Sequence, residues 1–336
     1  MANLFLRSPR TFTGIGTTGW NSAKLTLTIS GVTIYTLIKN RVTDAAVNFE
    51  VSELIRDYLN INYAGSVDAA SQSIYVGVAV SIYEGLDGNA PFQGVSANNF
   101  LAIDAYGYFE EGANPTTTKG YMQSNDVIYN LKDADILIPV DVNNSTQWNS
   151  YLNGSQVEGA AINGNTQQCF EYLTLTGLAD ELRISTTLGE KIIKIETIEE
   201  CRFKNHKISF VNRWGAVQDL YFFKKSIDKL STSRESFKNS IVTVGGAYNV
   251  HKHPNKDFNV KSLKTITLNS GYVSEDYNDL MKELMQSEQV WMEVDNVTTP
   301  MNVTDSTLTF KTSANDKLVD YKLDLRYAFD TINNMR

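Results

Sequence analysis

Residues 318–329 read LVDYKLDLRYAF, and this stretch decides the fold. Apolar and polar side chains alternate along it without a break. A period of two places one row of side chains in a core and the other in water, which is the pattern of a half-buried β-strand. Strands with one solvated face belong to antiparallel sheets. The apolar row consists of Val319, Tyr321, Leu323, Leu325, Tyr327 and Phe329, and the opposite row of Asp320, Lys322, Asp324, Arg326 and Ala328.

The same period recurs earlier in the chain. Residues 24–29 alternate between polar side chains and Leu25, Leu27 and Ile29. Residues 74–83 form a longer strand pattern with a Val- and Ile-rich face. Residues 207–211 and 219–223 flank the segment 212–215, where Gly215 can adopt a positive φ, and together they predict a β-hairpin. Strands therefore dominate the prediction.

Two segments follow the helical spacing i, i+3, i+4, i+7 instead. Ser52 and Ser274 are candidate N-caps, and each is followed by a glutamate, which the helix dipole favours there. Each helix has one apolar face that must lie on a sheet. We therefore predict a mainly β fold of antiparallel sandwich-like or barrel-like domains, each with one amphipathic helix packed on a sheet. The two apolar stripes are Val51, Leu54, Ile55, Tyr58 and Leu59, and Tyr277, Leu280, Met281, Leu284 and Met285.

A chain of 336 residues is about twice the usual size of one domain. Residues 143–167 are rich in Asn, Gly, Ser and Gln and mark the predicted boundary. We expect a β-rich domain over 1–145, a polar linker or long loop over 146–167, and a β-rich domain over 168–336 with its helix near 274–288. A second polar stretch, residues 251–256, predicts an exposed loop around Pro254.

Composition limits the function classes. The net charge is -8, with 8 Lys and Arg against 15 Asp and Glu in residues 1–165, and 22 against 23 in residues 166–336. Neither half is basic, so we expect no direct binding to nucleic acid and no docking on anionic lipid. No segment predicts a signal peptide or a membrane span, so we expect synthesis in a cytoplasm and no membrane insertion. Cys169 and Cys201 predict two reduced, buried thiols.

Glycine and histidine motifs give no catalytic assignment. Residues 14–19 match G-x-G-x-x-G, but Pro9 precedes the motif and a strand pattern follows it, whereas a dinucleotide site needs a helix there. A flexible loop is the prediction. His251 and His253 are expected as an exposed loop pair, because further metal ligands are lacking nearby. His206 offers little for a nucleophilic arrangement with either cysteine.

Two pairs of adjacent glutamates are candidate catalytic carboxylates. Glu110 with Glu111, and Glu199 with Glu200, are adjacent, so in strands their side chains would point to opposite faces and could not flank one glycosidic bond. We expect no catalytic, cofactor-binding or metal-binding residues and no cofactor. Four further side chains lack the regular calcium-loop spacing and are predicted to be solvated loop groups, namely Asp133, Asp135, Asp141 and Asn143.

Aromatic residues suggest surfaces for recognition. Tyr106, Tyr108 and Phe109 lie near Gly107 and Gly112 and predict a strand or loop with exposed rings, with ordinary sheet packing as the alternative. Exposed tyrosines of this kind would suit an interface or a sugar-binding surface.

Three blocks in the C-terminal part carry a resemblance. Residues 207–215 read KISFVNRWG and lead to LYFF at 220–223, residues 268–272 read LNSGY and lead through a helix to Val290 and Trp291, and residues 318–329 close the series before Ile332 and Asn333. Over about 200–336 the chain resembles structural and tail-associated proteins of tailed bacteriophages that infect Bacteroidetes or marine bacteria.

This resemblance implies a structural role in the virion, as a tail, tail-tip or baseplate ring subunit made in the host bacterial cytoplasm. It implies no enzyme activity. Its implied partners are further copies of the chain in a symmetric ring and other phage tail proteins. Two alternatives stay open: a receptor- or glycan-binding β-sandwich adhesin of the particle, and a polysaccharide hydrolase whose carboxylates come from distant segments.

Overall fold

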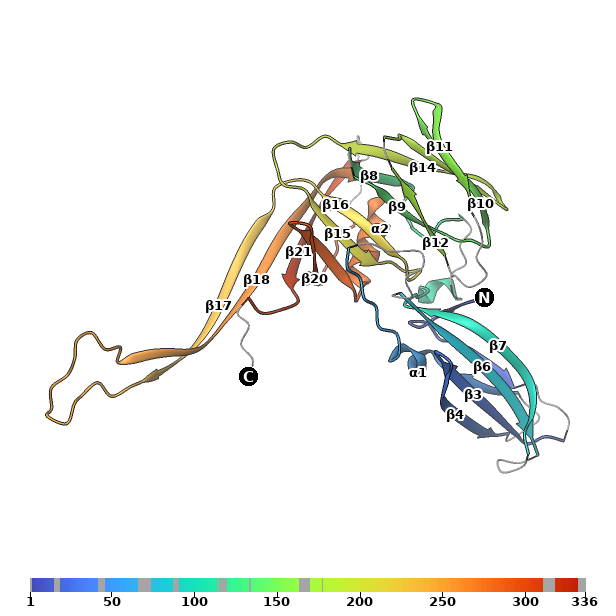
Figure 1. Ribbon diagram of the computed structural model, residues 1–336, viewed down its shortest axis with the longest axis horizontal. Coiled ribbons are helices and arrows are strands. Elements are labelled where there is room, and N and C mark those ends of the chain that lie inside the picture. The colour runs from blue at the N-terminus through green and yellow to red at the C-terminus, as the bar shows by residue number, and fades with distance from the viewer. Residues whose placement is uncertain are drawn as a thin grey trace.

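The fold is mainly β, as the sequence predicts. In a computed structural model of the chain (Figure 1), 57% of the described residues lie in strands and 6% in helices. A central body carries two projections, an N-terminal lobe and a long hairpin (Figure 1). The structure describes residues 2–14, 19–41, 46–65, 74–86, 91–112, 114, 120–132, 134–162, 170–176, 178–310 and 318–331.

The N-terminal lobe is built on a five-stranded sheet with the order β1-β7-β6-β3-β4. The predicted alternation is confirmed in its central strands, where Leu25, Leu27, Val78 and Val80 are buried. All its pairings are antiparallel except that of β1 with β7. The strands are β1 (Ala2–Phe5), β3 (Ser22–Ile29), β4 (Val32–Asn40), β6 (Tyr75–Gly85) and β7 (Gln93–Ile103).

A two-stranded sheet of β2 (Thr11–Gly14) and β5 (Val47–Glu50) leads into helix α1 (Ser52–Arg56). Ile55 is fully buried against the lobe's core, which confirms the predicted contact of helix and sheet. The prediction that Ser52 caps the helix is wrong. Val51 occupies the N-cap position, and the Ser52 hydroxyl instead accepts a hydrogen bond from the backbone N–H of Arg10 at 3.0 Å.

The middle lobe contains a five-stranded sheet with the order β11-β10-β13-β14-β8 and the β12–β9 pair. The predicted linker is wrong over residues 146–161, since β10 and β11 form a paired hairpin in this sheet, and residues 163–167 lie outside the described part of the chain. Trp148 and Ser150 face the interior while most side chains of β11 are exposed, so the polar composition reflects a solvated edge. The strands are β8 (Val127–Leu131), β9 (Ile136–Val140), β10 (Ser145–Leu152), β11 (Ser155–Ala161), β12 (Glu171–Leu175), β13 (Glu181–Thr186) and β14 (Gly189–Ile198).

The C-terminal lobe is a seven-stranded sheet with the order β16-β15-β19-β20-β21-β18-β17. The predicted hairpin over 207–223 is confirmed, with Val211 opposite Val217 across the turn and Gly215 at φ 78°. The strands are β15 (His206–Val211), β16 (Val217–Phe222), β17 (Ile227–Lys238), β18 (Asn255–Ser274), β19 (Val290–Val294), β20 (Val297–Val303) and β21 (Leu318–Tyr327).

Strand β21 confirms the prediction made from its alternation, because the apolar row from Val319 to Tyr327 is buried. Phe329 lies beyond the end of the strand and is exposed, so it does not continue that row. Helix α2 (Tyr277–Gln286) covers this core with its apolar stripe. Ser274 is not its cap, since Ser274 ends β18 and Asp276 holds the N-cap position.

A bulge interrupts the pairing of β18 with β21 between Asn269 and Tyr272. Gly271 has φ 76°, and a Cβ added there would overlap the ring of Phe223. The buried Ser270 hydroxyl accepts a hydrogen bond from the backbone N–H of Tyr321 at 2.9 Å, which fixes the bulge. The position therefore requires glycine for both its φ and its close approach.

We predict that Gly271→Ala lowers the free energy of unfolding by about 2–4 kcal/mol, since it combines a left-handed backbone with overpacking. Urea unfolding measures this loss. Gly246→Ala is a matched control, because Gly246 has the same φ of 76° with no atom within 4 Å of an added Cβ. A Gly271→Ala loss no larger than that of the control would contradict the packing argument.

One core cluster joins the three lobes. It combines Phe5 and Ile103 of the N-terminal lobe with Tyr172 of the middle lobe and Val211 and Trp291 of the C-terminal lobe. Tyr63 packs on Trp291 with ring centroids 5.0 Å apart. The lobes therefore share buried apolar surface at their junction.

Candidate functional site

The most distinctive surface is a long two-stranded hairpin, which we call the arm (residues 227–264). Strand β17 pairs with β18 from Ile227 opposite Thr267 to Lys238 opposite Asn255. All 12 residues of β17 are exposed. At about 3.3 Å per residue, the paired part is about 40 Å long. The arm projects away from the body (Figure 1).

Apolar side chains along the arm lie open to solvent. Leu230 is 61% exposed, and Phe237 packs edge-on against Phe258 with ring centroids 5.6 Å apart. A two-stranded ribbon has no second layer to cover such side chains, and contiguous exposed apolar surface marks an interaction site. The exposed large apolar residues of the arm are Ile227, Leu230, Phe237, Val242, Val244, Tyr248, Val250 and Phe258.

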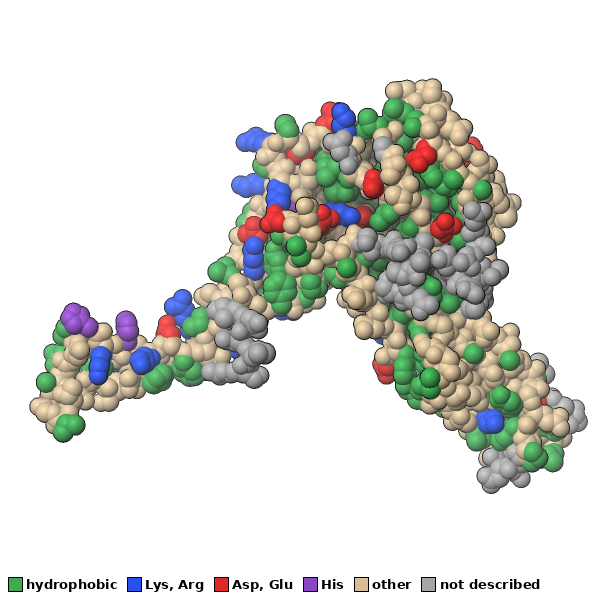
Figure 2. Space-filling model, viewed as in Figure 1, with side chains coloured by type: hydrophobic (Ala, Val, Ile, Leu, Met, Phe, Trp, Pro, Cys, Tyr) green, Lys and Arg blue, Asp and Glu red, His purple; other side chains and the backbone are tan. Residues whose placement is uncertain are grey.

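Charge on the arm has the opposite sign to the charge of the whole chain. The arm holds 7 Lys and Arg against 3 Asp and Glu, whereas residues 104–200 hold 5 against 15. Figure 2 shows lysine, arginine and histidine side chains gathered along the arm. The nearly equal numbers of basic and acidic residues in 166–336 therefore average over a basic arm and a more acidic remainder. Its basic residues are Lys229, Arg234, Lys238, Lys252, Lys256, Lys261 and Lys264.

Two of the three histidines lie on the arm. His251 and His253 lie exposed in the connection between the two arm strands, as expected for a loop pair. His206 is buried, and its Nε2 lies 3.1 Å from the Ser226 hydroxyl. Burial lowers the pKa of His206, so it stays neutral near pH 7. Among the described residues there is no group of three or more His, Cys, Asp or Glu side chains that could hold a metal ion.

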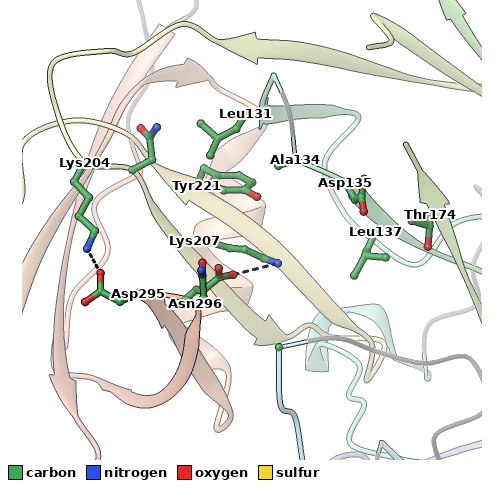
Figure 3. Close-up of a pocket in the computed structure, with 13 residues that line it drawn as sticks. Leu131, Ala134, Asp135, Leu137, Thr174, Lys204, Lys207, Tyr221, Asp295 and Asn296 are labelled. Carbon is green, nitrogen blue, oxygen red and sulfur yellow. Dashed lines mark hydrogen bonds and ion pairs between the residues drawn. The ribbon is translucent and has the colours of Figure 1, made fainter. Parts of the chain in front are cut away.

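An open pocket of about 680 Å³ lies between the middle and C-terminal lobes (Figure 3). Lys207 lies on its wall, with its Nζ 3.0 Å from an Asp219 oxygen and 3.8 Å from a Glu293 oxygen. Burial disfavours the charged form of Lys207, but the Asp219 carboxylate outweighs this and holds the pKa above its ordinary value. The lining side chains that can bond a polar ligand include Asp135, Thr174, Lys204, Asn205, Lys207, Tyr221, Glu293, Asp295 and Asn296.

The predicted aromatic surface lies instead at the junction of the lobes. Tyr106 is buried, and its hydroxyl donates a hydrogen bond to Gln286 at 3.1 Å. The Tyr108 ring lies under the guanidinium of Arg213 at 4.5 Å. The prediction of exposed rings is wrong for Tyr106, because its contacts come from distant parts of the chain. Phe109 is fully exposed.

Glu110 and Glu111 lie in the short 3-10 helix η1 (Phe109–Glu111), so the argument from strand geometry does not apply to them. Glu111 accepts two hydrogen bonds from Arg213 Nη2, at 2.7 and 2.6 Å. The bonds with Arg213 hold the pKa of Glu111 below its usual range. Glu110 lies 4.0 Å from Lys282. Both glutamates therefore make contacts at the junction of the lobes, Glu111 with Arg213 and Glu110 with Lys282.

Glu283 on α2 is a buried carboxyl at the same junction. Its oxygens accept hydrogen bonds from the Ser124 hydroxyl and, at 3.5 Å, from the backbone N–H of Arg213. Burial raises the pKa of Glu283 from 4.5 to about 7. Between about pH 4.5 and pH 7, Glu283 therefore keeps its proton in the folded protein but loses it in the unfolded chain.

From this we predict a pH-dependent stability. The free energy of unfolding falls as pH rises from about 4.5 to about 7, because the unfolded chain releases the proton first, and it levels off above that window. The total change is roughly 3 kcal/mol. Comparing urea unfolding of the natural chain and Glu283→Gln across pH 4–8 isolates the effect. Parallel pH profiles for the two proteins would refute it.

The cysteines, the glycine motif and the second glutamate pair form no common site among the described residues. Cys201 is exposed and free, so the prediction of a buried thiol is wrong for it, and Cys169 lies outside the described residues. Gly14 ends β2 and Gly19 has φ 90°, with residues 15–18 outside the description. Glu200 pairs with Lys224, while Glu199 is exposed.

The acidic residues predicted to lie in loops do not form a calcium site among the described residues. Asp141 accepts hydrogen bonds from the backbone N–H of Asn143 at 2.9 Å and from the side chain of Asn144 at 2.6 Å, which is a turn built on its carboxylate. Asp135 lies on the pocket wall, and Asp133 lies outside the described residues. None of the described helices is long and apolar enough to span a membrane.

No protein-family model matches this chain, and no curated protein matches its sequence. The arm, the pocket and the junction are therefore the features on which a functional proposal rests.

Proposed function

We propose that the chain is a structural subunit of a bacteriophage virion, in a tail, tail-tip or baseplate ring. Its partners are further copies of itself and other tail proteins, and in this role it is not an enzyme. The carrying observation is the arm, whose exposed apolar and basic side chains find no cover on their own body. The resemblance of residues 200–336 to phage tail-associated proteins gives the same role.

Ring subunits need an element that reaches beyond their own body. A contact between two different surfaces of the same protein closes into a ring when its rotation is right. A projecting hairpin is suited to such a contact, because its two strands offer both side chains and an open strand edge. The proposed location is the tail region of the virion, after synthesis in the host bacterial cytoplasm.

Mass spectrometry of purified virions tests the proposal. Peptides of this chain should be present, in an amount corresponding to several copies per particle. Virions that are infectious and lack the chain would overturn it. Quantification against the major head and tail proteins of the same particles separates a stoichiometric component from a contaminant.

The pocket favours a second candidate, recognition of a receptor or glycan by the particle. Its lining of hydroxyl, amide and charged groups around Tyr221 suits a polyhydroxylated ligand. The full chain should then bind members of a glycan array. Asp135→Ala with Thr174→Leu should abolish this binding, since both side chains line the pocket. No binding, or binding unchanged by the two substitutions, would reject this candidate.

A further inference from the structure

We infer that two copies of this chain join through the free edges of their β17 strands, which pair antiparallel about a two-fold axis at Thr232. The two arms then form one four-stranded ribbon. The inference goes beyond the proposed function, because it names the edge and the register through which copies pair before any ring is built. It is carried by an open strand edge and by a sequence along that edge that complements itself.

Strand β17 has an open edge with little to protect it. It is the last strand of the seven-stranded sheet, and in the described part of the chain it pairs only with β18. Natural proteins blunt such edges with proline, bulges or short strands. Strand β17 runs for 12 residues without proline. The irregularity of the ribbon lies in β18, where three residue steps from Phe258 to Lys261 face two on β17. A further strand can therefore pair along the whole length of β17.

The side chains on one face of β17 match their opposites in this register. With Thr232 at the axis, Lys229 lies opposite Glu235 of the second copy, and Ile227 lies opposite Phe237 of the second copy. The axis repeats each pair, and directly opposite side chains of antiparallel strands stabilise the pairing when they match. Lys229 has no ion pair with any described residue of its own chain. Ile227 and Phe237 are 48% and 46% exposed. The pairing thus supplies contacts that the single chain lacks.

The other face is also complementary. Asp228 lies opposite Ser236 of the second copy, and its diagonal neighbours there are Arg234 and Lys238. No like charges lie opposite each other anywhere along the paired strands. Moving the axis by one residue loses this match, because it places Ile227 opposite Glu235 on one side, or Lys229 opposite Phe237 on the other. The sequence of β17 therefore selects both a second copy as the partner and Thr232 as the centre.

The shape of the molecule leaves room for this pairing. The arm projects away from the body, and no described element lies beside the free edge of β17 (Figure 1). An antiparallel arrangement places the two bodies at opposite ends of the joined ribbon. A contact made by the same surface on both copies closes as a dimer. Since the pairing uses only the edge of β17, the faces and the tip of the arm remain for a head-to-tail contact in a ring.

Charge reversal within the register tests the pairing. Lys229→Glu puts like charges opposite each other at both symmetric pairs, and so does Glu235→Lys. Each single variant should therefore associate roughly 10–100-fold more weakly than the natural chain. Sedimentation velocity at about 50 mM salt, where screening is weak, measures this difference. Lys194→Glu and Glu196→Lys are the matched controls, because both side chains are exposed on the middle lobe. The controls should associate as the natural chain does.

Combining the two substitutions gives the sharper result. An equimolar mixture of the Lys229→Glu and Glu235→Lys chains should form a 1:1 dimer, since every charged pair is again of opposite sign. A chain that carries both substitutions keeps its net charge of -8. It should pair with itself but not with the natural chain, because the mixed pairing opposes like charges. A general electrostatic attraction between copies would not distinguish these combinations.

Cross-linking tests the position of the axis. The background for both variants is Cys169→Ser with Cys201→Ser, which removes the natural thiols. Thr232→Cys should then be joined to a second copy by a short bismaleimide, since side chains that meet at the axis have Cβ atoms about 4.5–5.5 Å apart. Ser236→Cys should not be joined, because the two copies of this position lie roughly 27 Å apart along the ribbon.

A natural chain that stays monomeric at high concentration and low salt would overturn the inference. So would single variants that associate at natural strength, a mixture of the two that stays monomeric, or equal cross-linking at the two positions. A monomeric chain whose β17 edge is bound by another tail protein would also overturn it and identify that protein as the partner. If virions contain the chain but the copies do not pair, only this inference fails. Absence from virions removes the proposed function and leaves a measured pairing unaffected.

Discussion

Arg213→Ala is expected to lower the free energy of unfolding by about 2–3 kcal/mol, because it removes a nearly buried side chain that packs against two aromatic rings and bonds the partly exposed Glu111 carboxylate. The Arg213 side chain is only 10% exposed and makes two hydrogen bonds to Glu111. Its guanidinium also lies 4.5 Å from the Tyr108 ring centroid and 5.1 Å from that of Trp214. Truncation removes the ion pair and both ring contacts together.

The effect extends beyond one ion pair because Arg213 lies in the β15–β16 turn and Glu111 in the segment that follows the N-terminal lobe. The Arg213 carbonyl also accepts a hydrogen bond from the backbone N–H of Tyr106 at 2.9 Å. The turn thereby holds the N-terminal lobe on the C-terminal lobe. We expect limited proteolysis of Arg213→Ala to begin within residues 104–112.

Urea unfolding measures the loss. Arg213→Lys is the matched control, since it keeps the charge but loses the two-fold hydrogen bond, and an intermediate loss is expected. A double-mutant cycle with Glu111→Gln isolates the pair itself. An Arg213→Ala loss below about 1 kcal/mol, the range of a surface ion pair, would contradict the account of the junction.

Deleting the outer arm is expected to abolish self-association and leave the body stable. Ser233 and Lys261 face each other across the ribbon, so Asn-Gly can replace residues 234–260 as a two-residue hairpin turn. None of the removed residues belongs to the core cluster of the C-terminal lobe, which begins on β18 at Ile266. The free energy of unfolding should therefore change by no more than about 1 kcal/mol.

Sedimentation velocity and urea unfolding of the same preparation measure the two properties separately. The shortened chain should sediment as a monomer at concentrations where the natural chain associates. A shortened chain that does not fold would show that the arm belongs to the body. One that associates as the natural chain does would exclude the arm as the contact.

The sequence predicts those parts of the fold in which one face of an element is buried. Strand β21 and helix α2 show clear periods because Leu323 and Leu284 face the same core. The β10–β11 hairpin and the arm have no such period, since many of their side chains face solvent on both sides. Segments of this kind read as loops, although backbone hydrogen bonds make them strands.

The junction could not be predicted for a different reason. Arg213 contacts Glu111 from 102 residues away, and Tyr106 bonds Gln286 from 180 residues away. No local spacing encodes such pairs. The arm did leave one signal in the sequence, its local excess of lysine, but charge summed over half-chains cancels it against the acids that surround it.

A cryo-electron microscopy reconstruction of the phage tail tests the central claim most directly. We expect several copies of this chain around the tail axis, with density for each arm in contact with the adjacent copy. A particle in which the chain is absent, or in which its arms extend into solvent and the copies meet through other surfaces, would contradict the account.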